Sequence, residues 1–582
     1  GNNYIRFYKE EGQILSGGSA YELSTTYTTA QVFDLRFTQS ADVLYICHGS
    51  HAPKKLSRTG HISWTLTDYD YGDGPYFDEN ATATTVTPSG LTGSVTLTAS
   101  SGIFASTDVG RNVRIQQALK WGAAKITNYS STTVVTATVI DDDDSAFEST
   151  AASSNWRLGS WYVNNWPAGQ PTFFNNRLVF CNTTAEPNAF WCSRSNDFES
   201  HKPTARDGAV ADTHAVNRLI TDSQVNAIYW LTVDNSDMFA GTSDGPFKIW
   251  SGIATAAFSP TNVKVDKQTR DGASNQAPTP AGDAILYVSR SSLKVRELSF
   301  SFEKDKHLSA NLSLLAEHIT KPGISHVEYT SEPDSIVWAI LTDGSLISMT
   351  YKRDENVIAW HKQILGGTGV EVESLAVIPG VVKRTINSAT HRYVEFLENR
   401  FEPTTLTDKN DAFFVDSGLS YSGGATSTIT GLSHLEGQVV SILADGATHA
   451  NKTVSSGQIT LDRTTERCHV GLGYTSKLVT LPLDSPMATG TSQGKTKRIS
   501  EVLLRVYKSL GGQIGPSEDN LERMLTRSGL NPMDSSPPLE TGDRILNFNG
   551  PHERQAKVTI IHDEPLPFTL VAIGPRAEIQ KR

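Results

Sequence analysis

The sequence predicts an all-β protein, built around a propeller-like repeat region with several smaller β-domains attached. Three observations lead to this prediction. Gly and Pro are frequent, at 45 and 25 residues, whereas Met occurs only 5 times, so turns are many. Thr, Ser and Val fill the runs between the turns, which favours short strands over long helices. A strand–turn–strand unit, often with an aromatic residue, recurs along the chain.

Six copies of this unit carry the propeller prediction. They lie at Val32–Leu66, Pro171–Phe198, Val225–Trp250, Asp283–Phe302, Ile324–Ile364 and Val372–Phe396. With one insertion excluded, their spacing is roughly the 40–50 residues of four-stranded propeller blades. We therefore expect six blades. No fixed motif marks each copy, so a set of ordinary hairpins in a β-sandwich is the alternative.

Two of the copies show the pattern most plainly. In the first, Phe33, Leu35 and Phe37 alternate with other residues as they would along a strand with one buried face. In the fifth, Pro333-Asp334 and Asp343-Gly344 are turn sequences that separate apolar strands. These segments predict small antiparallel sheets whose strands follow one another in chain order.

The length of 582 residues exceeds what one hydrophobic core supports and predicts roughly three or four domains. Shifts in composition divide the chain into an N-terminal hairpin with the first blade (1–80), an inserted small β-domain (81–156), the remaining blades (157–405), a β-barrel or sandwich (406–490) and a C-terminal β segment (491–582). The last segment is β apart from one helix or helical turn expected near Asn520–Arg527.

The termini and the apolar runs give little sign of targeting. The opening GNNYIRFYKEEGQI lacks an initiator Met and starts within what looks like a strand, so we expect an upstream N-terminal region to be missing. It does not have the form of a signal peptide. No run approaches the roughly 20 apolar residues that cross a bilayer.

Charge and cysteine usage restrict the function further. The net charge of −11 argues against a surface that coats nucleic acid, although DNA passing through a pore with a local basic lining is compatible with it. Cys47, Cys181, Cys192 and Cys468 form no C-x-x-C pair, so we expect four reduced, buried thiols. A disulfide across a hairpin between Cys181 and Cys192 is the alternative.

The acidic stretch TDYDYGDGPYFDEN is the best candidate for chemistry. Its carboxylates are interleaved with aromatic residues as in sugar-binding clefts; they are Asp68, Asp70, Asp73, Asp78 and Glu79, with Tyr69, Tyr71, Tyr76 and Phe77. A glycosidase needs two carboxylates about 5–10 Å apart. A polar loop between a blade and the insertion explains the same residues and is the favoured interpretation.

Metal-site candidates are weaker. His48, His51 and His61 lie close in sequence, but exposed histidines are common in hairpin turns. The run Asp141–Asp144 lacks the alternating ligands and Gly-mediated turn of a calcium loop, so a solvated loop is expected. The G-x-S-x-G and H-E-x-x-H motifs do not occur, and no Gly-rich run leads into a helix as a phosphate loop does. We therefore assign no catalytic, cofactor-binding or metal residue and expect no enzyme.

Two basic clusters suggest a possible contact with DNA. Lys54, Lys55 and Arg58 are expected in one turn, and Lys495, Lys497 and Arg498 precede an apolar strand; on the lumen of a ring, either cluster would touch phosphates without sequence preference. Solvated turns or salt bridges between subunits are the favoured interpretation.

Several segments, taken together, resemble one protein family. They are YIRFYKEEGQI, SADVLYICHGSHAPKKLSRTGHISWTL, EPDSIVWAILTDGSLISMTYKRDENVIAWHK, VDSGLSYSGGATSTITGLSHLEGQVVSILADG, VGLGYTSKLVTLP and VTIIHDEPLPFTLVAIGP. Their order and content resemble the tail nozzle, or tail tube terminator, proteins (tail tubular protein B-like) of short-tailed bacteriophages. The matches are collinear over most of the chain, and none is a catalytic fingerprint.

The resemblance implies a structural virion protein made in the bacterial cytoplasm. It implies a homohexameric ring at the distal end of the tail, below the adaptor proteins, with genomic DNA passing through its lumen. It also implies a platform for tail fibres, a spike or tip proteins, and no active site or cofactor. The alternative is a tail-associated protein that binds or cleaves glycans, for which Asp70 or Asp73 would be needed.

Overall fold

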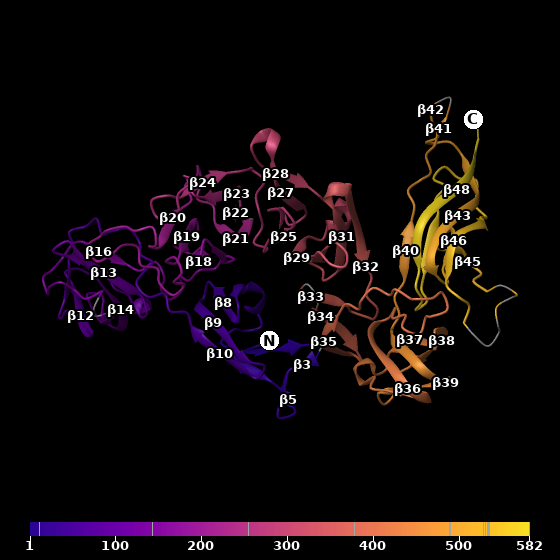
Figure 1. Cartoon of the computed structure of the whole chain (residues 1–582), viewed down its shortest axis with the longest axis horizontal. Coiled ribbons are helices and arrows are strands. Elements are labelled where there is room, and N and C mark those ends of the chain that lie inside the picture. Colours follow the sequence, from indigo (N-terminus) through magenta and orange to yellow (C-terminus); the bar gives the residue numbers. More distant parts are fainter. Residues whose placement is uncertain are drawn as a thin grey trace. The chain divides into compact units, whose positions relative to one another are not determined.

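A computed structural model describes residues 1–580, except 11, 142–143, 235, 254, 377–378, 488–489, 528, 530 and 532–535. Almost all regular structure in these residues is β (Figure 1). The described part contains one short α-helix, α1 (Glu317–Thr320). It also contains five 3-10 helices, which are Val32–Asp34, Ser106–Asp108, Phe302–Lys304, Arg353–Glu355 and Ser433–Leu435. The all-β prediction is confirmed.

The chain divides into two compact units. The first comprises Gly1–Thr342 and Met349–Trp360, and the second comprises Asp343–Ser348 and His361–Arg582. Within the described residues, no helix has the length and apolar character needed to cross a membrane.

Short hairpins precede the repeated sheets. Strands β1 to β6 are Tyr4–Arg6, Tyr8–Lys9, Gly12–Gln13, Leu15–Ser16, Ser19–Ala20 and Glu22–Ser24, pairing β1 with β6, β2 with β3 and β4 with β5. Phe7 stacks on Trp64 at 4.1 Å between ring centroids. Phe7 and Tyr27 share a core with Ile46 and Leu56, so the hairpins pack on the first repeated sheet.

Sheets of consecutive strands follow, and each of the six predicted copies falls on a different one (Figure 1). Sheet 1 is β7–β10 (Arg36–Ser40, Val43–His48, His51–Gly60, Ser63–Asp68), sheet 2 is β17–β20 (Thr172–Phe174, Arg177–Cys181, Ala189–Cys192, Val216–Leu219), and sheet 3 is β21–β24 (Ile228–Asp234, Asp237–Thr242, Gly245–Trp250, Lys264–Lys267). Sheet 4 is β25–β28 (Thr279–Ala281, Ala284–Val288, Val295–Ser301, Lys306–Asn311), sheet 5 is β29–β32 (Ile324–Thr330, Ile336–Leu341, Leu346–Lys352, Val357–Gln363), and sheet 6 is β33–β35 (Glu371–Leu375, Pro379–Ile386, Ala389–Phe396). Four-stranded meanders of this kind are the units of propeller-like folds. Their closure into one six-bladed ring stays a prediction.

The hydrophobic cores lie between successive sheets. Trp230 and Phe239 of sheet 3 share one core with Ile285 and Tyr287 of sheet 4. Two further cores join sheet 1 to sheet 2 and sheet 2 to sheet 3. All residues of β18, β19 and β26 are buried, because these strands have a neighbouring sheet on both faces.

The alternation expected in the first copy is wrong. Phe33 belongs to a 3-10 helix, and Phe33 and Phe37 are 59% and 54% exposed. The consecutive residues Tyr45–His48 of β8 are all buried instead, and so is Leu56 of β9. Both faces of β8 pack against neighbours, so its pattern is a continuous run.

The insertion after sheet 1 is a six-stranded sheet with its own core. Its order is β11-β12-β15-β14-β13-β16. In chain order the strands are β11 (Val86–Pro88), β12 (Ser94–Ala99), β13 (Asn112–Gln117), β14 (Lys120–Ser131), β15 (Val134–Val139) and β16 (Trp156–Leu158). Small β-branched residues such as Val95 and Val135 fill the core with Leu97, Ile115 and Phe147. This sheet occupies the segment expected to form a small β-domain.

Three larger sheets follow among the described residues of the second unit. One has the order β36-β39-β37-β38 (Asp416–Thr430, Gln458–Leu472, Val439–Ala444, Ala447–Thr453), one has the order β40-β47-β44-β45 (Ser476–Val479, Thr559–His562, Gln513–Ser517, Asn520–Arg523), and one has the order β46-β43-β48 (Glu540–Asn547, Lys497–Ser509, Thr569–Ile579). A small hairpin joins β41 (Pro486–Met487) to β42 (Gly490–Thr491). Strand β40 pairs with β47, so a segment that composition groups with the preceding domain belongs to the C-terminal sheets.

The helix expected near Asn520–Arg527 is absent. Asn520–Arg523 is strand β45, which pairs with β44 through Gln513↔Arg523 and Ser517↔Asn520. A neighbouring strand supplies the hydrogen bonds that a short polar segment cannot hold as an isolated helix. Tertiary pairing thus overrides the local preference.

A buried arginine gives a test of the second unit. Arg384 on β34 is fully buried; its Nε and Nη2 donate to the Glu395 carboxylate at 3.0 and 2.8 Å, and Nη1 donates to the Gly366 carbonyl. We expect Arg384→Met to cost about 3 kcal/mol of unfolding free energy, because Glu395 and Gly366 then lose their partner. Urea unfolding followed by circular dichroism measures this loss.

The matched control is Arg392→Met on the neighbouring strand. Arg392 also forms a two-point contact with a carboxylate, that of Glu373 at 2.6 and 2.9 Å, but its side chain is 58% exposed. We expect a cost of about 0–1 kcal/mol. Equal losses in the two variants would contradict the dominant role of burial.

Candidate functional site

The acidic loop after β10 uses most of its carboxylates for structure. Asp68 forms an ion pair with Lys54 at 2.5 Å, and Glu79 pairs with Arg157 at 3.3 Å. Asp70 accepts a hydrogen bond from the Gly72 amide at 3.1 Å. These contacts fix the path of the loop between sheet 1 and the inserted sheet.

Asp73 is a buried member of the same loop. It accepts a hydrogen bond from the Tyr76 hydroxyl and lies 3.9 Å from Nε of Arg114, and both charged side chains are nearly inaccessible. Burial, followed by the negative charge of Asp73, raises the pKa of Tyr76 well above its ordinary value. Asp73 therefore serves as the counter-ion of Arg114.

The aromatic residues of the loop do not line an open cleft together. Tyr69, Tyr71 and Tyr76 are buried, and Tyr69 and Tyr71 donate their hydroxyls to the Phe198 and Gly110 carbonyls. Tyr69 and Tyr71 belong to the core shared with Trp161 of the segment before sheet 2. The sequence pattern that suggested a sugar cleft is mainly a core pattern.

Two substitutions distinguish a structural from a catalytic use of this loop. We expect Asp73→Asn to lower the unfolding free energy by about 2–3 kcal/mol, because Arg114 loses its buried counter-ion. Asp70→Asn, at an exposed position, is expected to stay within about 0.5 kcal/mol of the wild type. Thermal unfolding by calorimetry compares them, and an unchanged Asp73→Asn protein would contradict the structural role.

The three histidines do not meet. His48 and His51 face each other across β8 and β9 with ring centroids 5.2 Å apart. His61 follows the far end of β9, roughly 30 Å from His51 along the strand, and its Nδ1 accepts from Arg58 at 3.1 Å. Across the described residues, no three His, Cys, Asp or Glu side chains gather in a metal-binding cluster.

The acidic run expected as a solvated loop is only partly described. Asp142 and Asp143 lie outside the described residues. Asp144 forms an ion pair with Lys202, whose side chain is 7% exposed. The described end of the run thus contacts the segment that connects β19 to β20 within sheet 2.

The first basic cluster lies on a strand and not in a turn. Lys54, Lys55 and Arg58 belong to β9, which pairs with both β8 and β10. Lys55 pairs with Glu199, and Arg58 lies 3.4 Å from Asp42. With the Lys54–Asp68 contact, each cation of this cluster has an acidic partner in the same chain.

The three residues of the second basic cluster differ in how far they are buried. Lys497 is 1% exposed, and its Nζ donates to the carbonyls of Leu483 and Arg554 at 2.6 and 3.3 Å. Arg498 is exposed and Lys495 half-buried. Lys497 begins β43 and anchors the segment before it, so this lysine is a structural residue that sequence spacing did not distinguish from its neighbours.

All four cysteines are buried and none is in a disulfide, as expected. Burial raises the pKa of the Cys47, Cys192 and Cys468 thiols to about 12. Cys181 stands opposite Phe190, and Cys192 stands opposite Val179, so the two cysteines are not cross-strand partners. The alternative disulfide is not formed.

Glu186 is a titratable residue that the sequence did not single out. It lies between β18 and β19, and its Oε2 is buried. Burial, and next the charge of Asp78, raise the pKa of Glu186 to about 7 from 4.5. No local motif marks it, because its environment is built by segments distant in sequence.

The raised pKa predicts a pH dependence of stability. The folded chain holds the Glu186 proton to a higher pH than the unfolded chain, so the stability from this group is present at low pH and lost as pH rises from about 5 through about 7. We expect Glu186→Gln to gain about 1 kcal/mol over wild type at pH 8, with no gain at pH 5. Melting curves at both pH values measure this, and Glu79→Gln, which breaks a surface ion pair, should show no such gain.

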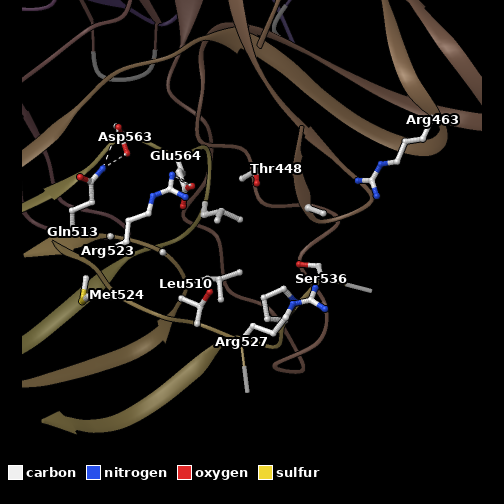
Figure 2. A pocket seen from close by; sticks show the side chains of 16 residues that line it. Thr448, Arg463, Leu510, Gln513, Arg523, Met524, Arg527, Ser536, Asp563 and Glu564 are labelled. Carbon is white, nitrogen blue, oxygen red and sulfur yellow. Dashed lines mark hydrogen bonds and ion pairs between the residues drawn. The ribbon is translucent and has the colours of Figure 1, made fainter. Parts of the chain in front are cut away.

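A polar cavity of about 370 Å³ lies in the second unit. Figure 2 shows Arg463 on one side and Arg523 with Glu564 on the other. Arg523 pairs with Glu564 at 2.9 Å, and the Gln513 amide donates to Asp563 at 3.3 Å. The guanidinium groups suit a carboxylate or phosphate. The described lining residues do not include a nucleophile held by a base.

Comparison with known proteins gives no family. No protein-family model matches the chain, and no curated protein matches it. Among solved structures, Raptor from Chaetomium thermophilum aligns with a TM-score of 0.27 and 10% identity over 63% of this chain. The chain spans only 28% of the length of that protein. A likeness of this size carries no conclusion about fold or function.

Proposed function

We propose that the chain is a structural protein of a short-tailed bacteriophage that forms the distal nozzle ring of the tail. The observation that carries the proposal is the collinear resemblance of its segments, from YIRFYKEEGQI near the N-terminus to VTIIHDEPLPFTLVAIGP near the C-terminus, to that family. In this proposal six copies surround a channel for the genome and hold fibres, a spike or a tip, below the adaptor proteins.

The packing supports a role as a channel wall. The repeated sheets of the first unit bury large side chains on both faces, and Trp161, Trp191 and Trp230 are fully buried between them. Such close-packed interiors have low compressibility. A conduit needs rigid walls of fixed shape and no reacting groups.

The charge distribution also supports the proposal. A channel that passes DNA must not hold it, and binding to the phosphate backbone grows with each unpaired cation that contacts it. Lys54, Lys55 and Arg58 are paired with acidic residues, and Lys497 is buried. Pairing and burial thus weaken the attraction of these four cations for DNA, and the net charge of the chain is −11.

Glycan cleavage finds less support than a structural role. Of the five candidate carboxylates, four hold the loop or neighbouring residues in place, namely Asp68, Asp70, Asp73 and Glu79. A hydrolase would need a pair free to act as acid and base or nucleophile. Only Asp78 keeps a carboxylate without such a contact among the described residues, so we do not propose catalysis.

The ring is tested by assembly state. We expect the purified full chain to form particles of six times its 63.3 kDa mass in mass photometry, and six-fold rings with a central hole by negative-stain imaging. Labelling of this chain should mark the distal end of the phage tail. A stable trimer or monomer on virions, or a label along the fibres, would contradict the proposal.

A further inference from the structure

The polar cavity of the second unit is surrounded by hydrogen-bond donors from separate segments of the chain. Its volume is about 370 Å³. Strand β38 contributes Thr448, strand β39 contributes Arg463, and the segment between β45 and β46 contributes Arg527 and Ser536. Figure 2 shows these side chains around one space. Guanidinium groups are donors only, and hydroxyl groups can donate, so the cavity is a candidate site for an anion.

The donor groups of this cavity are accessible to a ligand. Thr448, Arg463 and Arg527 are exposed, and Ser536 is half-buried. Arg463 donates from Nη2 to the Ala444 carbonyl at 2.8 Å, which holds the side chain in place. A guanidinium carries five N–H donors, so this contact leaves donors of Arg463 for a ligand.

Two carboxylates also line the cavity, and both are engaged by neighbouring side chains. Glu564 pairs with Arg523 at 2.9 Å, and Asp563 accepts a hydrogen bond from the Gln513 amide at 3.3 Å. Figure 2 shows these four residues together on one side, away from Arg463. The described lining residues include three arginines and only these two carboxylates, which leaves an excess of positive charge.

A buried lysine adds to this positive charge from behind the cavity wall. Lys409 is 2% exposed, and its Nζ donates to the Ser536 carbonyl at 3.3 Å and to the Pro537 carbonyl. Ser536 and Pro537 both line the cavity. Within the described residues Lys409 forms no ion pair, so no carboxylate there offsets its charge. Salt screens a buried charge less than an exposed one, so Lys409 also attracts an anion in the cavity.

From this arrangement we infer that the cavity binds a phosphate group, as free phosphate or as the phosphate monoester of a small molecule. The oxygens of phosphate point in tetrahedral directions, so they accept hydrogen bonds from Arg463 and Arg527 of different segments and from the Thr448 hydroxyl. A planar carboxylate is satisfied by one arginine through two parallel hydrogen bonds. The site lies within one chain, so the inference does not depend on the nozzle-ring proposal.

The test is phosphate binding by the full chain, measured by phosphorus NMR titration at low salt. We expect inorganic phosphate and glucose 6-phosphate to bind with dissociation constants on the order of millimolar. Arg463→Gln should weaken binding about tenfold, because charge-assisted hydrogen bonds are lost. The matched control is Arg505→Gln, which should bind as the wild type does. Arg505 is an exposed arginine of β43 outside the cavity, with a two-point contact to Asp543 at 2.6 and 2.8 Å.

A second variant should strengthen binding, which a misfolded protein cannot do. Asp563→Asn removes one negative charge from the lining, and the new amide oxygen can still accept from Gln513. We expect both phosphates to bind about threefold more tightly to this variant, because a repulsion is removed. The difference should shrink at high salt, which screens charges near the surface.

The two ligands distinguish the source of the phosphate group. Tighter binding of glucose 6-phosphate than of inorganic phosphate supports an organic phosphate, and otherwise the free anion is supported. Binding of neither ligand overturns the inference, as does equal affinity in the Arg463→Gln and Arg505→Gln proteins. An Asp563→Asn protein that binds no tighter than wild type also overturns it. So does acetate that competes as well as phosphate at equal concentration, because the site would then not select a phosphate group.

Discussion

Burial of both faces of each small sheet against the next is the constraint on which the first unit depends. A single meander of three or four short strands would leave the apolar side chains on both of its faces in water. Its side chains must be covered by the preceding and the following sheet, as Trp230 and Tyr287 are between sheets 3 and 4. Chain order and packing order therefore agree, and each hairpin becomes stable only with its neighbours.

The same constraint accounts for where charged groups are buried. Arg114 and Asp73 lie between the acidic loop and the inserted sheet, and Arg384 on the central strand of sheet 6 pairs with Glu395 on the neighbouring strand. A buried cation requires a partner, so each of these contacts fixes two segments relative to each other. Carboxylates that look available in the sequence are used for this purpose.

This use of polar residues separates two kinds of function. A wall protein uses its carboxylates and arginines to hold loops, whereas an enzyme keeps some of them free in a cavity. In the acidic loop the first use prevails, because Asp68, Asp73 and Glu79 pair with Lys54, Arg114 and Arg157 of other segments. The loop thus holds the insertion in place, and its described residues do not include the pair of free acids that hydrolysis needs.

The sequence by itself determined the all-β class, the six strand–turn–strand segments and the burial of four thiols, because turn residues and apolar runs act over a few neighbouring positions. Only the tertiary structure decided which face each residue takes. Phe33 lies in a 3-10 helix and Phe37 on the edge strand β7, and both are exposed, whereas Asn520–Arg523 is a strand because β44 pairs with it. The position of Glu186 near Asp78 and the polar cavity of the second unit arise from residues more than a hundred positions apart, and no local pattern encodes such a meeting.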